Sequence, residues 1–214
     1  MSTSRRSRIH VLAGVNGAGK SSIGGAAVRQ HGSEYFNPDE VARTLREKAP
    51  ALTQAGANSA AWRQGASLLS RAIEEHLEFT FETTLGGNTI TGLLVQAAEQ
   101  GIEVHIWYVG LASPELHIER VQARVRRGGH DIPAHDIHRR YEHSRLNLIA
   151  LLPHLTTLHV YDNSLDADPA AGRTPKPTLV LHMEHGSILG PPDLASTPTW
   201  AKPIVAAALK LNRS

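Results

Sequence analysis

Eight consecutive residues near the N-terminus have the types and spacing of a phosphate-binding loop. Residues 14–21 have the sequence GVNGAGKS, which matches the pattern G-x-x-x-x-G-K-[ST]. Glycines let successive backbone N–H groups point at phosphate oxygens, Lys20 can reach the β and γ phosphates, and the Ser21 hydroxyl is the expected Mg²⁺ ligand. The motif therefore predicts ATP and Mg²⁺ binding by Gly14, Asn16, Gly17, Ala18, Gly19, Lys20, Ser21 and Ser22.

Two acidic residues follow segments that should end near this loop. Asp39 comes just after the apolar pair Tyr35–Phe36, and Glu82 lies at the end of the run FTFE. Because the carboxyl ends of parallel strands meet at one edge of a sheet, both are candidates for receiving the proton of an acceptor hydroxyl. The structural alternatives are a favourable charge at a helix N-terminus for Asp39 and an ordinary polar strand end for Glu82.

Arginines are dense between residues 120 and 140. Arg120, Arg124 and Arg127 follow i, i+4, i+7 spacing, so one helical face would present three guanidinium groups, and Arg139 or Arg140 can approach from the next helix. Such groups can compensate the charge that spreads over a phosphoryl group during transfer. The alternative is a solvated arginine-rich face.

The segment around these arginines has the character of a mobile lid. Gly128–Gly129 would be its hinge, which lets the arginines close over the phosphates and exclude water. Without interleaved aromatic residues, nucleic-acid binding is not expected. A metal site is not expected either, because nothing supplies a clear remaining ligand shell for His130, His135, His138 and His143.

The apolar pattern predicts the elements that position these residues. Runs bounded by turn residues predict strands at 8–13, 35–36, 78–83, 102–111 and 157–161, and an edge strand at 179–183. Helical spacing predicts helices from the phosphate loop through Val28, from Pro38, and over 60–77, 88–98, 114–127, 134–152 and 203–211. A loop over 50–59 is expected to join the helix that begins at Pro38 to the helix over 60–77. The alternation predicts an α/β class, the P-loop NTPase three-layer fold, with a mostly parallel five-stranded sheet, helices on both faces and an arginine-bearing lid at about 113–145.

Composition limits the classes of protein that fit. The chain has 214 residues, 41% hydrophobic and 20% charged, which suits one domain with appendages. We expect a flexible basic N-terminus over 1–8, a kinase core over 9–164, and a linker with a C-terminal extension packed on the core over 165–214. No apolar run suits a membrane span or a signal peptide, so a soluble, cytoplasmic protein is expected. Zero cysteines exclude disulfides and thiolate chemistry.

Taken together, several segments resemble the zeta toxin family of P-loop kinases. They are GVNGAGKS, FNPDEVAR, FETTL, RVQARVRRGGHDIP with RRYEHS behind it, and VYDNS, within residues 9 to 164. The resemblance implies ATP- and Mg²⁺-dependent phosphorylation of a UDP-activated amino sugar of the UDP-N-acetylglucosamine class, with the sugar 3′-hydroxyl as acceptor. It also implies a possible small antitoxin protein as partner.

Carried over by motif, the resemblance assigns roles to individual residues. Lys20 and Ser21 match the nucleotide and metal positions, and Asp39 matches the aspartate that activates the acceptor hydroxyl. The glutamate-x-threonine sequence that holds the substrate falls on Glu82, Thr83 and Thr84, and the lid arginines fall on Arg124, Arg127 and Arg140. The NPDE sequence and the double-glycine lid depart from better-known members of the family.

Two other functions fit the same residues. One is a kinase that phosphorylates another small hydroxylated metabolite or a nucleotide, and the other is a non-catalytic ATP-binding regulator. The short chain favours a small phosphotransferase, and the missing N-K-x-D sequence disfavours a GTPase.

Overall fold

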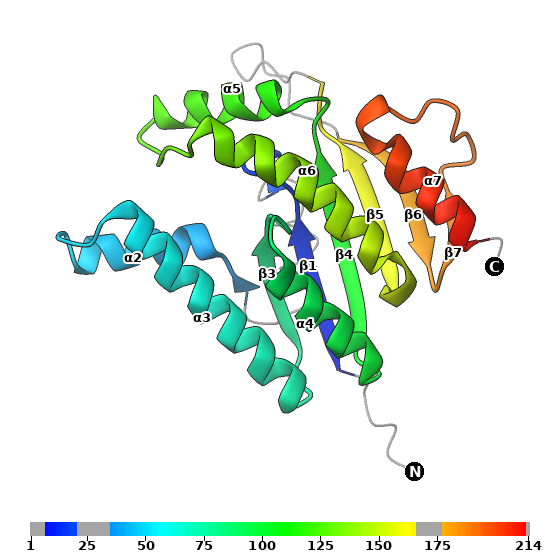
Figure 1. Cartoon of the computed structure of the whole chain (residues 1–214), viewed down its shortest axis with the longest axis horizontal. Coiled ribbons are helices and arrows are strands. Elements are labelled where there is room, and N and C mark those ends of the chain that lie inside the picture. Colours follow the sequence, from blue (N-terminus) through cyan, green and yellow to red (C-terminus); the bar gives the residue numbers. More distant parts are fainter. Residues whose placement is uncertain (1–6, 21–34, 166–176, 213–214) are drawn as a thin grey trace.

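The sheet that carries the phosphate loop has seven strands. The computed structural model describes residues 7–20, 35–165 and 177–212 (Figure 1). The strand order is β2-β3-β1-β4-β5-β6-β7. The bounds are β1 Arg8–Ala13, β2 Tyr35–Phe36, β3 Phe79–Thr83, β4 Glu103–Gly110, β5 Thr157–Asp162, β6 Thr178–Glu184 and β7 Ser187–Gly190. Strands β1 to β5 are all parallel to one another, which confirms the predicted α/β class.

The predicted count of five strands was wrong, because the C-terminal part of the chain adds a hairpin to the sheet. Strand β6 pairs antiparallel with β5, and β7 pairs antiparallel with β6, so β6 is not an edge strand. The turn between them places His185 at φ 46° and Gly186 at φ 79°. Two positive φ values suit a tight hairpin turn, but histidine is not a typical residue at such a position, so the hairpin signal in the sequence is weak.

Most helices lie where the sequence predicted them. Their bounds are α2 Pro38–Lys48, α3 Gln54–Glu74, α4 Asn88–Glu99, α5 Pro114–Val125, α6 Ala134–Leu151 and α7 Lys202–Leu211. Helix α3 begins six residues earlier than predicted, inside the expected loop 50–59, because the Thr53 side chain caps it by accepting a hydrogen bond from Gly56 N. The helix predicted from the phosphate loop through Val28 falls mostly on 21–34, outside the described residues.

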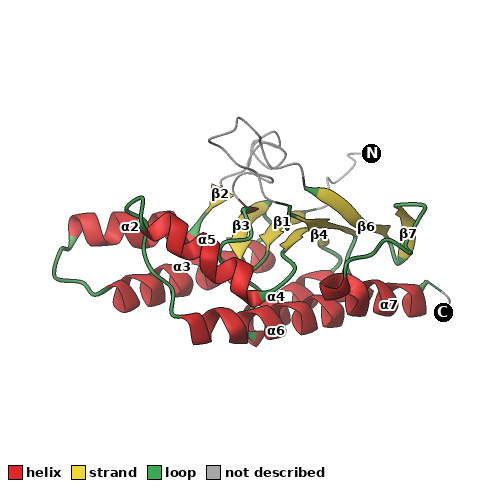
Figure 2. Ribbon diagram, turned by 90° about the horizontal axis from the view of Figure 1, so that it is seen from above, coloured by secondary structure: helices red, strands yellow, loops and turns green. Residues whose placement is uncertain are grey.

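The main core lies between the sheet and four helices. Helices α3, α4, α6 and α7 lie on the same face of the sheet (Figure 2). Along β1, Ile9 and Val11 are fully buried in this core, while His10 between them belongs to the other face and stacks on His105 of β4. This packing fixes the strand ends that carry the candidate site.

The C-terminal segment contacts the end of β4. The ring of Trp200 lies so close to Gly110 that a Cβ there would be 2.2 Å from it, and its Nε1 donates to Asp162 Oδ1 over 3.1 Å. The division into a basic N-terminus, a core and an extension stays a prediction, and most of the N-terminus lies outside the described residues. Among the helices of the described ranges, none is long and apolar enough to cross a membrane.

Candidate active site

The phosphate loop follows β1 directly, at the carboxyl end of the parallel strands. Gly14 N donates to Thr83 O over 3.2 Å, and Gly14 has φ 139°, with its missing Cβ position 2.2 Å from Val109 O. Gly17 and Gly19 also have positive φ, at 83° and 87°. No other residue type fits these three positions without strain, and an added Cβ would clash with Val109, His117 or Asn163, so glycine is required for this path of the loop.

Neighbouring elements hold the loop in place. His117 of α5 donates from Nδ1 to Asn16 O over 2.8 Å, and Asn163, just after β5, donates from Nδ2 to Ala18 O over 2.8 Å. Burial lowers the pKa of His117 to about 4, since the bond to Asn16 only partly offsets the loss of water. The buried side chains of His117 and Asn163 therefore hold two backbone carbonyl groups of the phosphate loop in position.

Lys20 is the charged centre of the site. Its Nζ donates to Gly14 O over 2.8 Å. Burial lowers the pKa of Lys20, while the carboxylates of Glu82 and Asp39 act to raise it, and the guanidinium groups of Arg124 and Arg140 lower it. The structure therefore brings together the predicted ammonium, both predicted carboxylates and two of the predicted arginines. The predicted residues Ser21 and Ser22 lie outside the described residues.

Asp39 lies in the first turn of α2, opposite the lid. The Asn37 side chain caps this helix, accepting from Asp39 N over 2.9 Å. The Asp39 carboxylate is half exposed, with Oδ2 3.8 Å from Arg124 and Oδ1 3.8 Å from His130 Nε2. Asp39 thus lies at a helix N-terminus and also faces the lid residues Arg124 and His130, and its role as the base stays a prediction.

Glu82 is a buried acid in β3. Only 7% of it is exposed, and its Oε1 accepts hydrogen bonds from Tyr35 and, over 3.4 Å, from Asn37 Nδ2. Hydrogen bonds from these two neutral donors hold the Glu82 carboxylate in one orientation, with the Lys20 ammonium nearby. This placement departs from that of an ordinary polar residue at a strand end.

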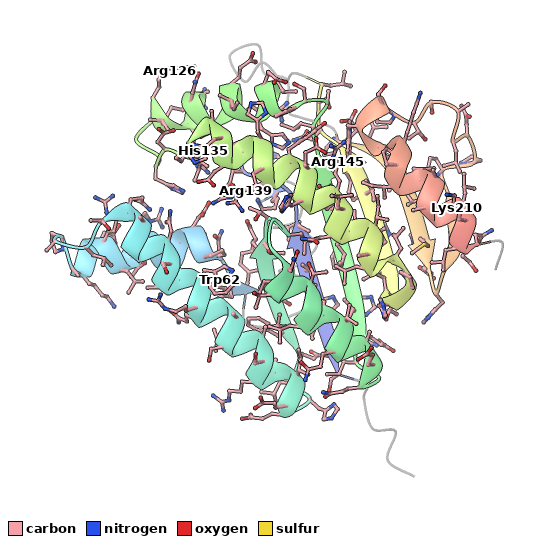
Figure 3. The ribbon with its side chains drawn as sticks, in the orientation of Figure 1. Trp62, Arg126, His135, Arg139, Arg145 and Lys210 are labelled. Atoms are coloured by element: carbon pink, nitrogen blue, oxygen red, sulfur yellow. The ribbon has the colours of Figure 1, made fainter. Side chains whose placement is uncertain are left out.

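A cavity of about 340 Å³ opens beside these acids. The predicted acceptor-binding residues Asp39, Glu82, Thr83 and Thr84 all line it. Its other walls combine aromatic, aliphatic and polar residues, contributed by the phosphate loop, β2, β3, α3, α4, α6 and the segments that precede α4 and α6. The lining includes Trp62 of α3 and Arg139 of α6, both labelled in Figure 3. The cavity can accept a small molecule with a planar ring and polar groups.

The lid arginines occupy different positions. Arg140 donates to Asn16 Oδ1 over 2.7 Å and lines the cavity, whereas Arg139 pairs with Asp136 over 2.8 Å. Arg124 lies near Asp39. Arg127 follows the end of α5 and lines a second cavity, of about 740 Å³, between α2 and the loop that joins α5 to α6.

Sequence reasoning missed several residues of the site. Trp62 was assigned to the predicted helix over 60–77 without a role in the site, yet it is 48% exposed and lines the cavity. Asn37 precedes the predicted helix start at Pro38 and was given no role in the site. His117 carried no motif signal, and Asn163 lies in the VYDNS segment but was assigned no role; only the three-dimensional structure shows that both contact the phosphate loop.

These residues can together perform phosphoryl transfer. A positive loop with an ammonium group suits a polyphosphate, and a carboxylate faces the cavity where an acceptor hydroxyl would lie. Arg140 touches both the loop and the cavity, where it can compensate charge on the transferred group.

Comparisons with solved structures agree with this fold. The complex of AvrRxo1-ORF1 and AvrRxo1-ORF2 with ATP contains a chain that is 16% identical, with a TM-score of 0.64, over 97% of this chain and 65% of that one. The PezAT chromosomal toxin-antitoxin system of Streptococcus pneumoniae contains a chain that is 16% identical, with a TM-score of 0.55, over 82% of this chain and 75% of that one. The chain thus spans slightly less than two thirds of the AvrRxo1 chain it matches.

Comparisons of sequence give the family. An uncharacterized protein of Haemophilus influenzae is 33% identical over 129 residues, which is 60% of this chain and 88% of that protein. The family model AAA_33, described as an AAA domain, matches residues 9–147, which contain the phosphate loop, both acids and the lid arginines. With more than half of its length matched and a P-loop kinase-like fold, the chain belongs to the AAA_33 family.

Proposed function

We propose that this protein is an ATP-dependent phosphotransferase that phosphorylates a hydroxyl group of a small molecule bound in the cavity beside Asp39 and Glu82. The observation that carries the proposal is that Asn16 of the phosphate loop lines the same cavity as Asp39 and Glu82, and the charges of both acids also act on the Lys20 ammonium. A nucleotide site and an acceptor site thus share one wall.

The proposed nucleotide is ATP. The three positive-φ glycines give the loop a path that side chains would strain, and Lys20, which among the described residues donates to Gly14 O, can turn to phosphate oxygens. The AvrRxo1 complex, at a TM-score of 0.64, was solved with ATP, which supports the same nucleotide for this fold. Ser21 would hold Mg²⁺, which when bound neutralises the phosphates.

The proposed chemistry is direct transfer. Asp39 orients the acceptor hydroxyl and takes its proton, the hydroxyl oxygen bonds to the γ-phosphorus, and the bond from that phosphorus to the β–γ bridging oxygen breaks, which releases ADP. Glu82, Thr83 and Thr84 hold the acceptor. Arg140 and the lid residues Arg124 and Arg127 stabilise the transferred charge.

The proposed acceptor is a UDP-activated amino sugar of the UDP-N-acetylglucosamine class. The zeta-toxin resemblance of the GVNGAGKS, FNPDE and FETTL segments suggests it. The cavity agrees, since Trp62 offers a face for a planar base and Arg139 a charge for phosphate. The alternative is another hydroxylated metabolite or a nucleotide.

A small antitoxin protein is the proposed partner. The PezAT structure is of a toxin-antitoxin system, and the AvrRxo1 structure contains AvrRxo1-ORF2 in complex with AvrRxo1-ORF1. We infer that a partner of this kind would obstruct the nucleotide site.

The test is transfer of labelled γ-phosphate from ATP to a panel of acceptors. UDP-N-acetylglucosamine, other UDP-sugars, nucleosides, NAD and simple sugars are compared in the presence of Mg²⁺. Label on a UDP-sugar supports the full proposal, and label on another acceptor supports the alternative kinase. Tight ATP binding with no labelled product supports the non-catalytic regulator instead.

A further inference from the structure

One buried imidazole of the site has no role in the proposed chemistry. His130 lies in the loop between α5 and α6, and its carbonyl accepts from Arg124 over 3.2 Å. A Cβ at Gly129 would lie 2.7 Å from Arg124 Cγ, so the glycine lets the backbone pack against the arginine stem. This packing fixes the imidazole of His130 in position above α2.

The imidazole points at the proposed base. Its Nε2 lies 3.8 Å from Asp39 Oδ1, and only 20% of the side chain is exposed. That nitrogen is itself buried and has no hydrogen-bond partner among the described residues. The distance between His130 Nε2 and Asp39 Oδ1 exceeds the length of a normal hydrogen bond by roughly 1 Å or less. A small closing movement at Gly128, which has φ 89°, would complete the contact.

The surrounding charges keep this imidazole neutral. Burial lowers the pKa of His130 most strongly, and Arg124 of α5 and Arg140 of α6 lower it further. Asp39 of α2 and the adjacent Asp131 raise it, but the net direction is below the usual value. A neutral imidazole with a free ring nitrogen is a proton acceptor.

We propose that His130 is a positioning residue that acts through Asp39: its unprotonated Nε2 accepts the proton that Asp39 takes from the acceptor hydroxyl. The inference rests on the proposed function. The proton moves from the acceptor oxygen to Asp39 and then to His130 Nε2, while the γ-phosphoryl group moves to the acceptor oxygen and ADP leaves. His130 returns the proton to water when the lid opens.

The kinetic test compares His130→Gln with His135→Gln, a matched change at an 80% exposed histidine of the same lid segment. His130→Gln should lower kcat roughly 10-fold to 100-fold with the KM of both substrates almost unchanged. It should also move the acid limb of the kcat profile to lower pH, because protonated His130 cannot accept a proton in the wild type, whereas in the variant only protonation of Asp39 blocks the reaction. Unchanged kcat, or a loss of kcat with the acid limb at its wild-type pH, would overturn the proposal.

A second measurement does not depend on turnover. In the whole protein, NMR titration should give a lower pKa for His130 in Asp39→Asn than in the wild type, because the carboxylate raises it. An unchanged pKa would overturn the pairing whatever the kinetics. If the pKa responds but no acceptor is phosphorylated, the proposed function fails and the proton relay with it, while the contact between the two side chains stands.

Discussion

Asn37 joins the two acids of the site: its Oδ1 accepts from Asp39 N over 2.9 Å, and its Nδ2 lies 3.4 Å from Glu82 Oε1. One buried amide therefore caps α2 and orients the acid of β3. The distance between the proposed base and the proposed acceptor-holding residue depends on this side chain.

Replacing Asn37 should separate its two roles. Asn37→Ser keeps a helix cap but loses the donor to Glu82, so we expect near-normal thermal stability with a clearly raised KM for the acceptor. Asn37→Ala loses both, and should cost an additional ~1 kcal/mol of unfolding free energy. Thermal unfolding and steady-state kinetics of both variants measure this, and equal kinetics for Asn37→Ser and the wild type would contradict it.

Trp62 should contribute to acceptor binding and little to stability. It is 48% exposed and lines the cavity, so Trp62→Ala should raise the acceptor KM about 10-fold or more, as expected for a lost stacking face of ~1.5 kcal/mol. The KM for ATP should stay unchanged. Leu146→Ala, at a 62% exposed residue outside the cavity, is the control. Equal effects of the two changes on the acceptor KM would show that Trp62 has no special role.

Gly19 should be essential to nucleotide binding because both its backbone conformation and the space around it exclude a side chain. It has φ 87°, and a Cβ there would lie 2.6 Å from Asn163 Nδ2. Gly19→Ala should therefore displace Asn163 and distort the loop, with loss of measurable ATP binding by calorimetry. Gly101→Ala has similar backbone strain at φ 79° but nothing within 4 Å of the new Cβ. That control should lose about 1 kcal/mol of stability and keep ATP affinity. Normal ATP affinity in Gly19→Ala would refute this account.

Arg140 should matter more to turnover than Arg127. Arg140 touches the loop through Asn16 and lines the acceptor cavity, whereas Arg127 lines only the second cavity. Arg140→Gln should lower kcat by about 100-fold or more, in the range of a lost transition-state donor. Arg127→Gln should have a smaller effect on kcat. Parallel kinetics of the two variants rank the residues, and a larger loss in Arg127→Gln would reverse our assignment.

His117 should make the fold sensitive to acid. Its pKa is about 4 in the folded protein against 6.5 as the ordinary value, so the unfolded chain binds the proton first. Stability should fall as the pH falls from about 6.5 to about 4, by roughly 3 kcal/mol for this group, and the fall should level off below that. Urea unfolding of His117→Gln should show a weaker pH dependence than that of the wild type. An identical dependence would contradict the assignment.

Much of this fold could be predicted from the sequence because local signals agree with it. Asn37 and Pro38 mark the start of α2, Ser113 and Pro114 mark the start of α5, and β1 has its predicted bounds. The start of α3 was missed because Thr53 is a cap that the loop-like composition of 50–59 conceals.

The site was only partly predictable, for a physical reason. Motifs identify residues that touch phosphate, such as Lys20, because backbone geometry and charge are both required in one short segment. Contacts such as Tyr35 with Glu82, or His130 with Asp39, join segments distant in sequence. Their existence depends on the register of β2 and on the path of the lid loop, which local patterns do not specify.

The central claim is that Asp39 serves the transfer of phosphate and not the binding of nucleotide. The most direct test is ADP release with the best acceptor, measured beside ATP affinity, in the wild type and in Asp39→Asn. The account predicts unchanged ATP affinity and a loss of acceptor-dependent ADP release by about 100-fold or more. Acceptor-dependent release that persists at the wild-type rate in Asp39→Asn would contradict it.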